Sequence, residues 1–115
     1  MDIDLIFTVL ETSDYKSVIS SGSFIPESFE ETGHIRCFEG AQAEQIINKN
    51  YKSHSSLLLV IIDPIRIQAP IKRNKEDGVE YIDVFGTFNT DAVIDKITLQ
   101  KSDKGTFALK VKHYD

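Results

Sequence analysis

Runs of apolar residues predict that the core of this protein is built on β-strands. The segment Leu57–Ile62 is hydrophobic at every position, which is typical of a central strand covered on both faces. Ile3–Leu10 is also rich in aliphatic residues and contains neither glycine nor proline, so it predicts a second buried strand. Asp63–Pro64 ends the first of these segments, because proline cannot continue a hydrogen-bonded central strand.

The segment Gly33–Phe38 alternates between two kinds of side chain. With the period of two of a β-strand, His34 and Arg36 share one face, whereas Ile35 and Cys37 share the other. The segment therefore predicts a strand with one polar and one apolar face, and we take it as the centre of the fold.

A second segment, Tyr81–Gly86, has the same construction. Tyr81, Asp83 and Phe85 share one face, and two aliphatic residues between them share the other. If the polar faces of the two segments meet, an imidazole, a guanidinium, a carboxylate and aromatic rings would line a small pocket.

Helical spacing occurs in two places. Tyr15, Val18 and Ile19 form a narrow apolar stripe that ends near Gly22, and a longer stripe runs through Ala41–Tyr51. Strands and helices in this order predict an α+β domain spanning residues 1–115, with two helices packed on a mostly antiparallel sheet.

The second half of the chain contains weaker signals. Pro70 predicts that any strand beside it lies at a sheet edge. The basic run Lys72–Lys75 is cut short by acidic residues and is interpreted as a solvated loop, and Asn74–Gly78 as a turn-rich loop. Alternation in residues 97–100 and 107–111 predicts a C-terminal hairpin.

Composition narrows the function classes. The formal net charge is −5, and no basic cluster could neutralise phosphates, so nucleic acid is excluded as an expected partner. The longest apolar run is far shorter than the roughly 20 residues of a membrane helix, and no signal peptide is recognisable. The single cysteine fits a reducing compartment, so we expect a cytoplasmic protein.

Two kinds of reactive centre are disfavoured by spacing. Cys37 and His34 would lie on opposite faces of one strand, so they are not expected to form a nucleophilic dyad, and Cys37 is predicted to be a core residue. His34, His54 and His113 are too far apart in sequence to give the short ligand spacing of a zinc site, and no metal site is predicted.

The facing positions Arg36 and Asp83 leave two interpretations open. They could form an ion pair between neighbouring strands, worth about 0–1 kcal/mol if it is exposed. Alternatively, Arg36 could donate to a phosphate or carboxylate, with Tyr81 or Phe85 as a stacking surface for the ring of a small molecule.

Five motifs occur in a fixed order along the chain: Gly22–Phe29, Gly33–Cys37 with Gln42, Leu57–Pro64, Tyr81–Gly86 and Asp91–Val93. Over roughly residues 5–95, this ordered set resembles a small bacterial family known as domain-of-unknown-function family 952. The resemblance implies a compact α+β domain similar to the ADP-ribosyltransferase superfamily, whose split sheet holds NAD or an ADP-ribose group in a central cleft.

This chain departs from the family at positions that matter for chemistry. Members typically have histidines where this chain has Thr8, Arg36 and Asp83, and a tyrosine where it has Phe85. A Trp–Glu pair of the family is replaced by Arg73–Asn74. The changes imply a different ligand or a lost activity, and an Arg36–Asp83 ion pair could replace the histidine contact.

Two hypotheses follow from the residues and the resemblance. The first is a small-molecule site, nucleotide- or NAD-like, lined by Thr8, His34, Arg36, Tyr81, Asp83 and Phe85. If it is an enzyme, it would be a transferase or glycohydrolase in which Asp83 or Glu80 stabilises a developing positive charge. The second is a non-catalytic protein-interaction module on the same fold, and the missing histidines favour binding over catalysis.

Overall fold

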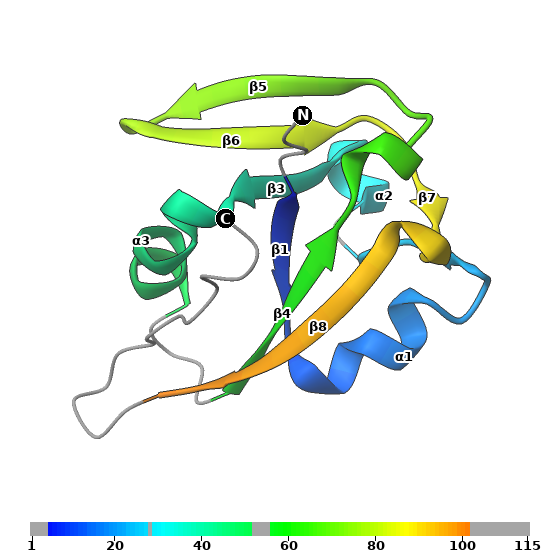
Figure 1. Ribbon diagram of the computed structural model, residues 1–115, viewed down its shortest axis with the longest axis horizontal. Coiled ribbons are helices and arrows are strands. Elements are labelled where there is room, and N and C mark those ends of the chain that lie inside the picture. Colours follow the sequence, from blue (N-terminus) through cyan, green and yellow to red (C-terminus); the bar gives the residue numbers. More distant parts are fainter. Residues whose placement is uncertain (1–4, 28, 52–55, 102–115) are drawn as a thin grey trace.

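A mostly antiparallel sheet dominates the computed structural model, which describes residues 5–27, 29–51 and 56–101 (Figure 1). Every pairing between neighbouring strands is antiparallel within these residues. A separate two-stranded ribbon pairs β2 (Ser23–Phe24) with β7 (Phe88–Asn89). The six strands of the main sheet lie in the order β5 (Ile71–Glu76), β6 (Val79–Val84), β3 (Ile35–Glu39), β1 (Ile6–Leu10), β4 (Ser56–Ile62) and β8 (Val93–Gln100).

The strand β4 lies inside the sheet, between β1 and β8, as its unbroken apolar run predicts. Residues 57–62 are buried, and they alternate between two core clusters on opposite faces of the sheet. One face, which we call the α3 face, packs against α3 (Gly40–Asn50) through residues such as Phe7 and Leu59. The other, the α1 face, packs against α1 (Tyr15–Val18) through residues such as Ile6 and Val60.

Both predicted helices are present. The first is a 3-10 turn, Thr12–Asp14, that continues into the four-residue α1, and Gly22 follows in the left-handed conformation (φ 89°). The second is α3, which buries Ala43, Ile46 and Ile47. A single turn, α2 (Phe29–Thr32), precedes β3. The prediction of an α+β architecture with a mostly antiparallel sheet is confirmed.

The sheet is partly split between β1 and β3. β1 pairs with β4 along its whole length, but with β3 only at Ile6–Glu39 and Phe7–Phe38. In Figure 1, β5, β6 and β3 accordingly run in a clearly different direction from β1, β4 and β8. The split separates a three-strand unit, β5–β6–β3, from the rest of the sheet, and this unit carries most of the predicted site.

The loop predicted over Lys72–Lys75 is wrong, because these residues belong to the strand β5. All six residues of β5 are exposed, so the strand has no apolar period to reveal it. A two-residue turn, Asp77–Gly78, joins β5 to β6, and both residues have positive φ (53° and 78°) as in a type I′ turn. The edge position expected from Pro70 is confirmed, since β5 lies at one edge of the sheet.

The first strand of the predicted C-terminal hairpin is part of β8, which pairs with β4 from Ile62–Val93 to Ser56–Gln100. Its second strand, residues 107–111, lies outside the described residues, as do His54 and His113. Within the described part of the chain, no helix is long and apolar enough to cross a membrane.

Candidate functional site

The register of β3 against β6 brings the two polar segments together, as the alternation predicts. Arg36 lies directly opposite Asp83, and Ile35 lies opposite Val84. The flanking residues Ile35 and Cys37 belong to the core cluster of the α1 face, so the side chain of Arg36 leaves the sheet on the α3 face. Tyr81 is buried in the cluster of that same face.

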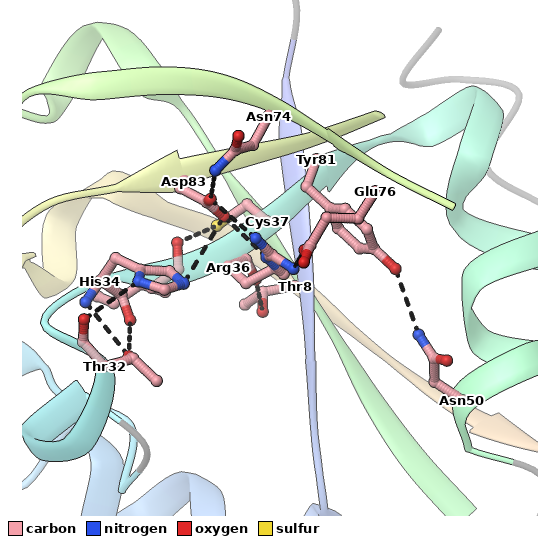
Figure 2. Close-up of polar contacts among 11 residues, drawn as sticks. Thr8, Thr32, His34, Arg36, Cys37, Asn50, Asn74, Glu76, Tyr81 and Asp83 are labelled. Carbon is pink, nitrogen blue, oxygen red and sulfur yellow. Dashed lines mark hydrogen bonds and ion pairs between the residues drawn. The ribbon is translucent and has the colours of Figure 1, made fainter. Parts of the chain in front are cut away.

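Arg36 and Asp83 form a two-pronged ion pair at the centre of the site (Figure 2). Arg36 Nε donates to Asp83 Oδ1 at 2.9 Å, and Arg36 Nη2 donates to Oδ2 at 3.0 Å. Asn74 Nδ2 adds a third hydrogen bond, to Oδ2 at 2.9 Å. Because the Asp83 side chain is only 1% exposed, this carboxylate is satisfied by protein groups. The ion-pair interpretation of these facing positions is confirmed.

The remaining groups of Arg36 are also engaged. Arg36 Nη1 forms an ion pair with Glu76, and the guanidinium lies over the Tyr81 ring, 4.3 Å from its centroid. The Tyr81 hydroxyl accepts a hydrogen bond from Asn50 of α3 at 3.4 Å. Arg36 therefore joins β3, β5 and β6, and its donors are directed at protein carboxylates.

The environment of Asp83 stabilises its ionised form. Burial alone would raise the pKa of Asp83, but hydrogen bonds from Arg36 and Asn74, together with the positive charge of Arg36 and the electrostatic influence of His34, outweigh this effect. The pKa of Asp83 is consequently lower than that of an ordinary aspartate. Conversely, the hydrogen bond to Asp83 raises the pKa of Arg36 more than desolvation lowers it, with Glu76 adding to the rise.

His34 and Phe85 form the more accessible end of the site. Their rings lie 5.5 Å apart between centroids, and His34 Nε2 is 4.0 Å from Asp83 Oδ1. Phe85 is 42% exposed, and the side chain of His34 is 22% exposed. Hydrogen bonds with Thr32 hold the backbone of His34 in place. This end of the site offers an aromatic ring and an imidazole to solvent.

Thr8 does not join the other five predicted residues. It lies opposite Val60, whose side chain belongs to the cluster of the α1 face, so the Thr8 side chain leaves the sheet on that face. Its hydroxyl donates to the backbone carbonyl of Arg36 at 3.0 Å, just beyond the last paired residues of β1 and β3. Thr8 thus provides a hydrogen bond to the Arg36 carbonyl at the split of the sheet, and it positions the Arg36 backbone from the α1 face.

Replacing Thr8 with valine should destabilise the fold without changing its shape. Valine keeps the volume of threonine but removes the hydroxyl, so the Arg36 carbonyl loses a hydrogen bond at a cost of about 1 kcal/mol. Urea unfolding of Thr8→Val beside Thr98→Val, at an exposed position of β8, measures the difference. Equal stabilities of the two variants would contradict a structural role for the Thr8 hydroxyl.

Cys37 lies in the core, as predicted. It is fully buried, and its thiol points toward the carbonyl of Ile35, with Sγ 3.8 Å from the oxygen. Burial, followed by the negative charge of Asp83, raises the pKa of the Cys37 thiol. The thiol is therefore kept protonated and away from solvent, and it is not suited to act as a nucleophile.

Three residues on β5 contribute to the α3 face although the sequence interpretation placed them in a loop. Lys72, Asn74 and Glu76 lie opposite Asp83, Tyr81 and Val79, respectively. The dipeptide Asp77–Gly78 is the sequence signal that could have revealed this hairpin, since Asp-Gly favours a type I′ turn.

Glu80, the other predicted carboxylate, lies away from the site. It alternates with Tyr81 and so faces the α1 side, where Arg73 donates to it at 3.0 Å and to Glu39 at 2.7 Å. Two hollows of about 200 and 260 Å³ also occur elsewhere on the described part of the chain, beside α1 and beside β7. None of the six predicted residues lines either hollow.

The fold and this cluster define a small α+β domain with a polar face on its split sheet. The family described as "Protein of unknown function (DUF952)" matches residues 9–96, and the chain belongs to this family. The resemblance stated from the motifs is thereby confirmed.

Solved structures of a protein from Caulobacter crescentus, CC0527, share the fold. Its crystal structure superposes with a TM-score of 0.80 at 18% sequence identity, covering 96% of this chain and 97% of that one. Its solution NMR structure gives a TM-score of 0.68 at 16% identity, covering 89% and 90%, respectively. Among curated proteins, none matches the chain. At these identities the similarity establishes the architecture.

Proposed function

We propose that this protein is a small-molecule binding domain with an ADP-ribosyltransferase-like fold, and that it holds a nucleotide- or NAD-like ligand on the α3 face. The observation that carries the proposal is the convergence of His34, Arg36, Tyr81, Asp83 and Phe85 on one face of β3 and β6. The partial split of the sheet beside this face supports the same assignment.

The accessible end of the face suits the ring of such a ligand. Phe85 presents an exposed aromatic surface, and stacking on aromatic rings is a common way to hold a planar base. His34 lies beside it; its Nδ1 is 3.3 Å from the Thr32 carbonyl oxygen, so Nε2 is the ring nitrogen that would form a hydrogen bond with a ligand. What distinguishes Phe85 from the other exposed apolar residues is its place on the polar α3 face, with its ring 5.5 Å from that of His34.

The positions of the carboxylates Asp83 and Glu80 favour ligand binding over catalysis. A carboxylate that stabilises a developing oxocarbenium ion must approach the sugar. Asp83 is nearly inaccessible and already accepts from Arg36 and Asn74, while Glu80 faces the other side of the sheet. Arg36 likewise uses its donors on Asp83 and Glu76, which disfavours a direct grip on phosphate.

Truncating the Phe85 ring tests the proposal. Isothermal titration calorimetry with NAD, ADP-ribose, AMP and adenosine should detect binding of at least one compound, and Phe85→Ala should weaken it about tenfold. Ile65→Ala is the matched control, because Ile65 is a large apolar residue that is 64% exposed and lies in the turn after β4. This control should bind as the native protein does.

Thermal unfolding provides an independent readout. A ligand at 100 times its dissociation constant should add about 2.7 kcal/mol to the free energy of unfolding. NAD incubated with the protein should be recovered intact, whereas release of nicotinamide would contradict the absence of catalysis. If none of the compounds binds, the proposal fails and the interaction module becomes the better hypothesis, since β5 offers an exposed strand at the sheet edge.

A further inference from the structure

Lys72 is a cation on the α3 face that no group in the described part of the chain neutralises. Its Cα lies opposite that of Asp83 in the β5–β6 pairing, so the two side chains leave the sheet on the same face. Lys72 is exposed, and within residues 5–27, 29–51 and 56–101 its ammonium makes no ion pair or hydrogen bond. Asp83 is already occupied by Arg36 and Asn74, which explains why the facing lysine is left available.

The charges around Lys72 permit an anion to approach. Arg36 pairs with two carboxylates, those of Asp83 and Glu76. The positive charge of Lys72 compensates the negative charge that remains on these three side chains. The chain as a whole carries a net charge of −5, so this face is less repulsive to an anion than the average surface. His34 lies on the same face and adds positive charge when it is protonated.

Lys72 and Phe85 are close enough on the α3 face to contact one small ligand. Phe85 N donates to the carbonyl of Pro70 at 2.8 Å, which continues the β5–β6 register by one residue beyond Val84. Phe85 is therefore the diagonal neighbour of Lys72, with Cα atoms roughly 7–8 Å apart, a separation that a long lysine side chain can span. A ring stacked on Phe85 would carry its substituent into reach of the Lys72 ammonium.

We infer that the ligand is a flat ring bearing an anionic group, phosphate or carboxylate, and that Lys72, assisted by His34, binds this anionic group while Phe85 holds the ring. Arg36 does not contact the anion and instead keeps Asp83 ionised and in place. This inference rests on the proposed function and deepens it, because it names the charge of the ligand and the residue that selects it.

The experiment compares two ligands that share a ring and differ in charge. AMP should bind the native protein about tenfold more tightly than adenosine, because a hydrogen bond from a charged group is gained. Lys72→Gln should abolish this preference and leave the affinity for adenosine unchanged. Nicotinate and nicotinamide form a second pair that tests a carboxylate in place of the phosphate.

Lys75 provides the matched control. It is an exposed lysine on the same strand, but it lies opposite Glu80, so its side chain leaves the sheet on the α1 face. Lys75→Gln should retain the full preference for AMP and for nicotinate. Phe85→Ala should weaken adenosine and AMP by the same factor, because the ring is common to both.

The outcomes separate this inference from the proposed function. If a ring compound binds but Lys72→Gln and Lys75→Gln change its affinity equally, or if adenosine binds as tightly as AMP and nicotinamide as tightly as nicotinate, the role of Lys72 is overturned and the binding function stands. If no compound binds the native protein at all, the proposed function itself is overturned, and the inference falls with it.

Discussion

Arg36→Met should lower the free energy of unfolding at pH 7 by about 3 kcal/mol, the largest stability effect expected at the site. Within the described residues, the substitution removes two of the three hydrogen bonds to Asp83. It leaves a carboxylate with a side chain that is 1% exposed, hydrogen-bonded to Asn74 and 4.0 Å from His34 Nε2. A buried charge without its counter-ion costs far more than the loss of an exposed ion pair. Urea unfolding at constant salt measures the loss.

The matched control is Arg73→Met. Arg73 also forms two ion-pair contacts, with Glu39 and Glu80, but its side chain is 55% exposed. This variant should lose about 0–1 kcal/mol. If Arg36→Met costs no more than Arg73→Met, the central role of the Arg36–Asp83 pair is refuted. A double-mutant cycle with Asp83→Asn should also reveal coupling, and strict additivity would contradict the direct contact.

The pH dependence of stability gives a further signature of the same pair. The pKa of Asp83 is lowered in the folded protein, so the unfolded state binds more protons as the pH falls. The stabilisation due to Asp83 is therefore complete above the unfolded pKa of about 3.9 and is lost as the pH falls through the folded pKa.

In Arg36→Met the pKa of Asp83 should be raised on folding, whereas in the native protein it is lowered. Burial without a cation raises the pKa of a carboxyl group, so the folded state of the variant would take up the proton first. The stability of this variant relative to the native protein should then improve as the pH is lowered from 7 toward 4. If the difference in stability between the variant and the native protein stays constant over this range, Asp83 is not a buried carboxylate with a raised pKa in the variant.

Gly86→Ala should lower the free energy of unfolding by about 2 kcal/mol, the second-largest effect. A Cβ at Gly86 would lie 2.8 Å from the Cβ of Ala69, closer than two such atoms can approach. Phe85, the preceding residue, donates its N–H to Pro70, so the displaced segment is the one that positions the aromatic ring of the site. Thermal and urea unfolding measure the loss, and NMR shifts of Phe85 report the displacement.

Ala69→Gly distinguishes the contact from a general effect of losing a glycine. In the Gly86→Ala background it removes the atom that the new Cβ meets, so part of the lost stability should return. Gly22→Ala is the matched control, because Gly22 also has a positive φ (89°) but has no atom within 4 Å of an added Cβ. Ala69→Gly should give no rescue there. Equal effects in both backgrounds would contradict the steric explanation.

Residue patterns predicted the parts of the fold in which burial is one-sided or complete. The apolar run of β4 required cover on both faces, and the alternation in Gly33–Phe38 and Tyr81–Gly86 assigned each side chain to a face. These patterns work because a strand has a fixed period of two, so burial is encoded in the order of residues.

The strand β5 escaped prediction for the opposite physical reason. An edge strand exposed along its whole length buries no side chain, so selection for burial leaves no periodic pattern in its sequence. What holds it in place is the turn at Asp77–Gly78 and the backbone pairing with β6. The contributions of Asn74, Glu76 and Lys72 to the site were hidden for that reason.

By itself, the sequence determined the α+β class, the core position of Cys37 and the faces on which His34, Arg36, Asp83 and Phe85 lie. Only the tertiary structure decided which other residues join or leave the site. Asn74 and Glu76 of β5 contact Asp83 and Arg36, and Thr8 is turned to the other face. Lys72, opposite Asp83, makes no ion pair within the described residues. Faces follow from local periodicity, whereas contacts follow from strand order and register, which depend on packing across the whole sheet.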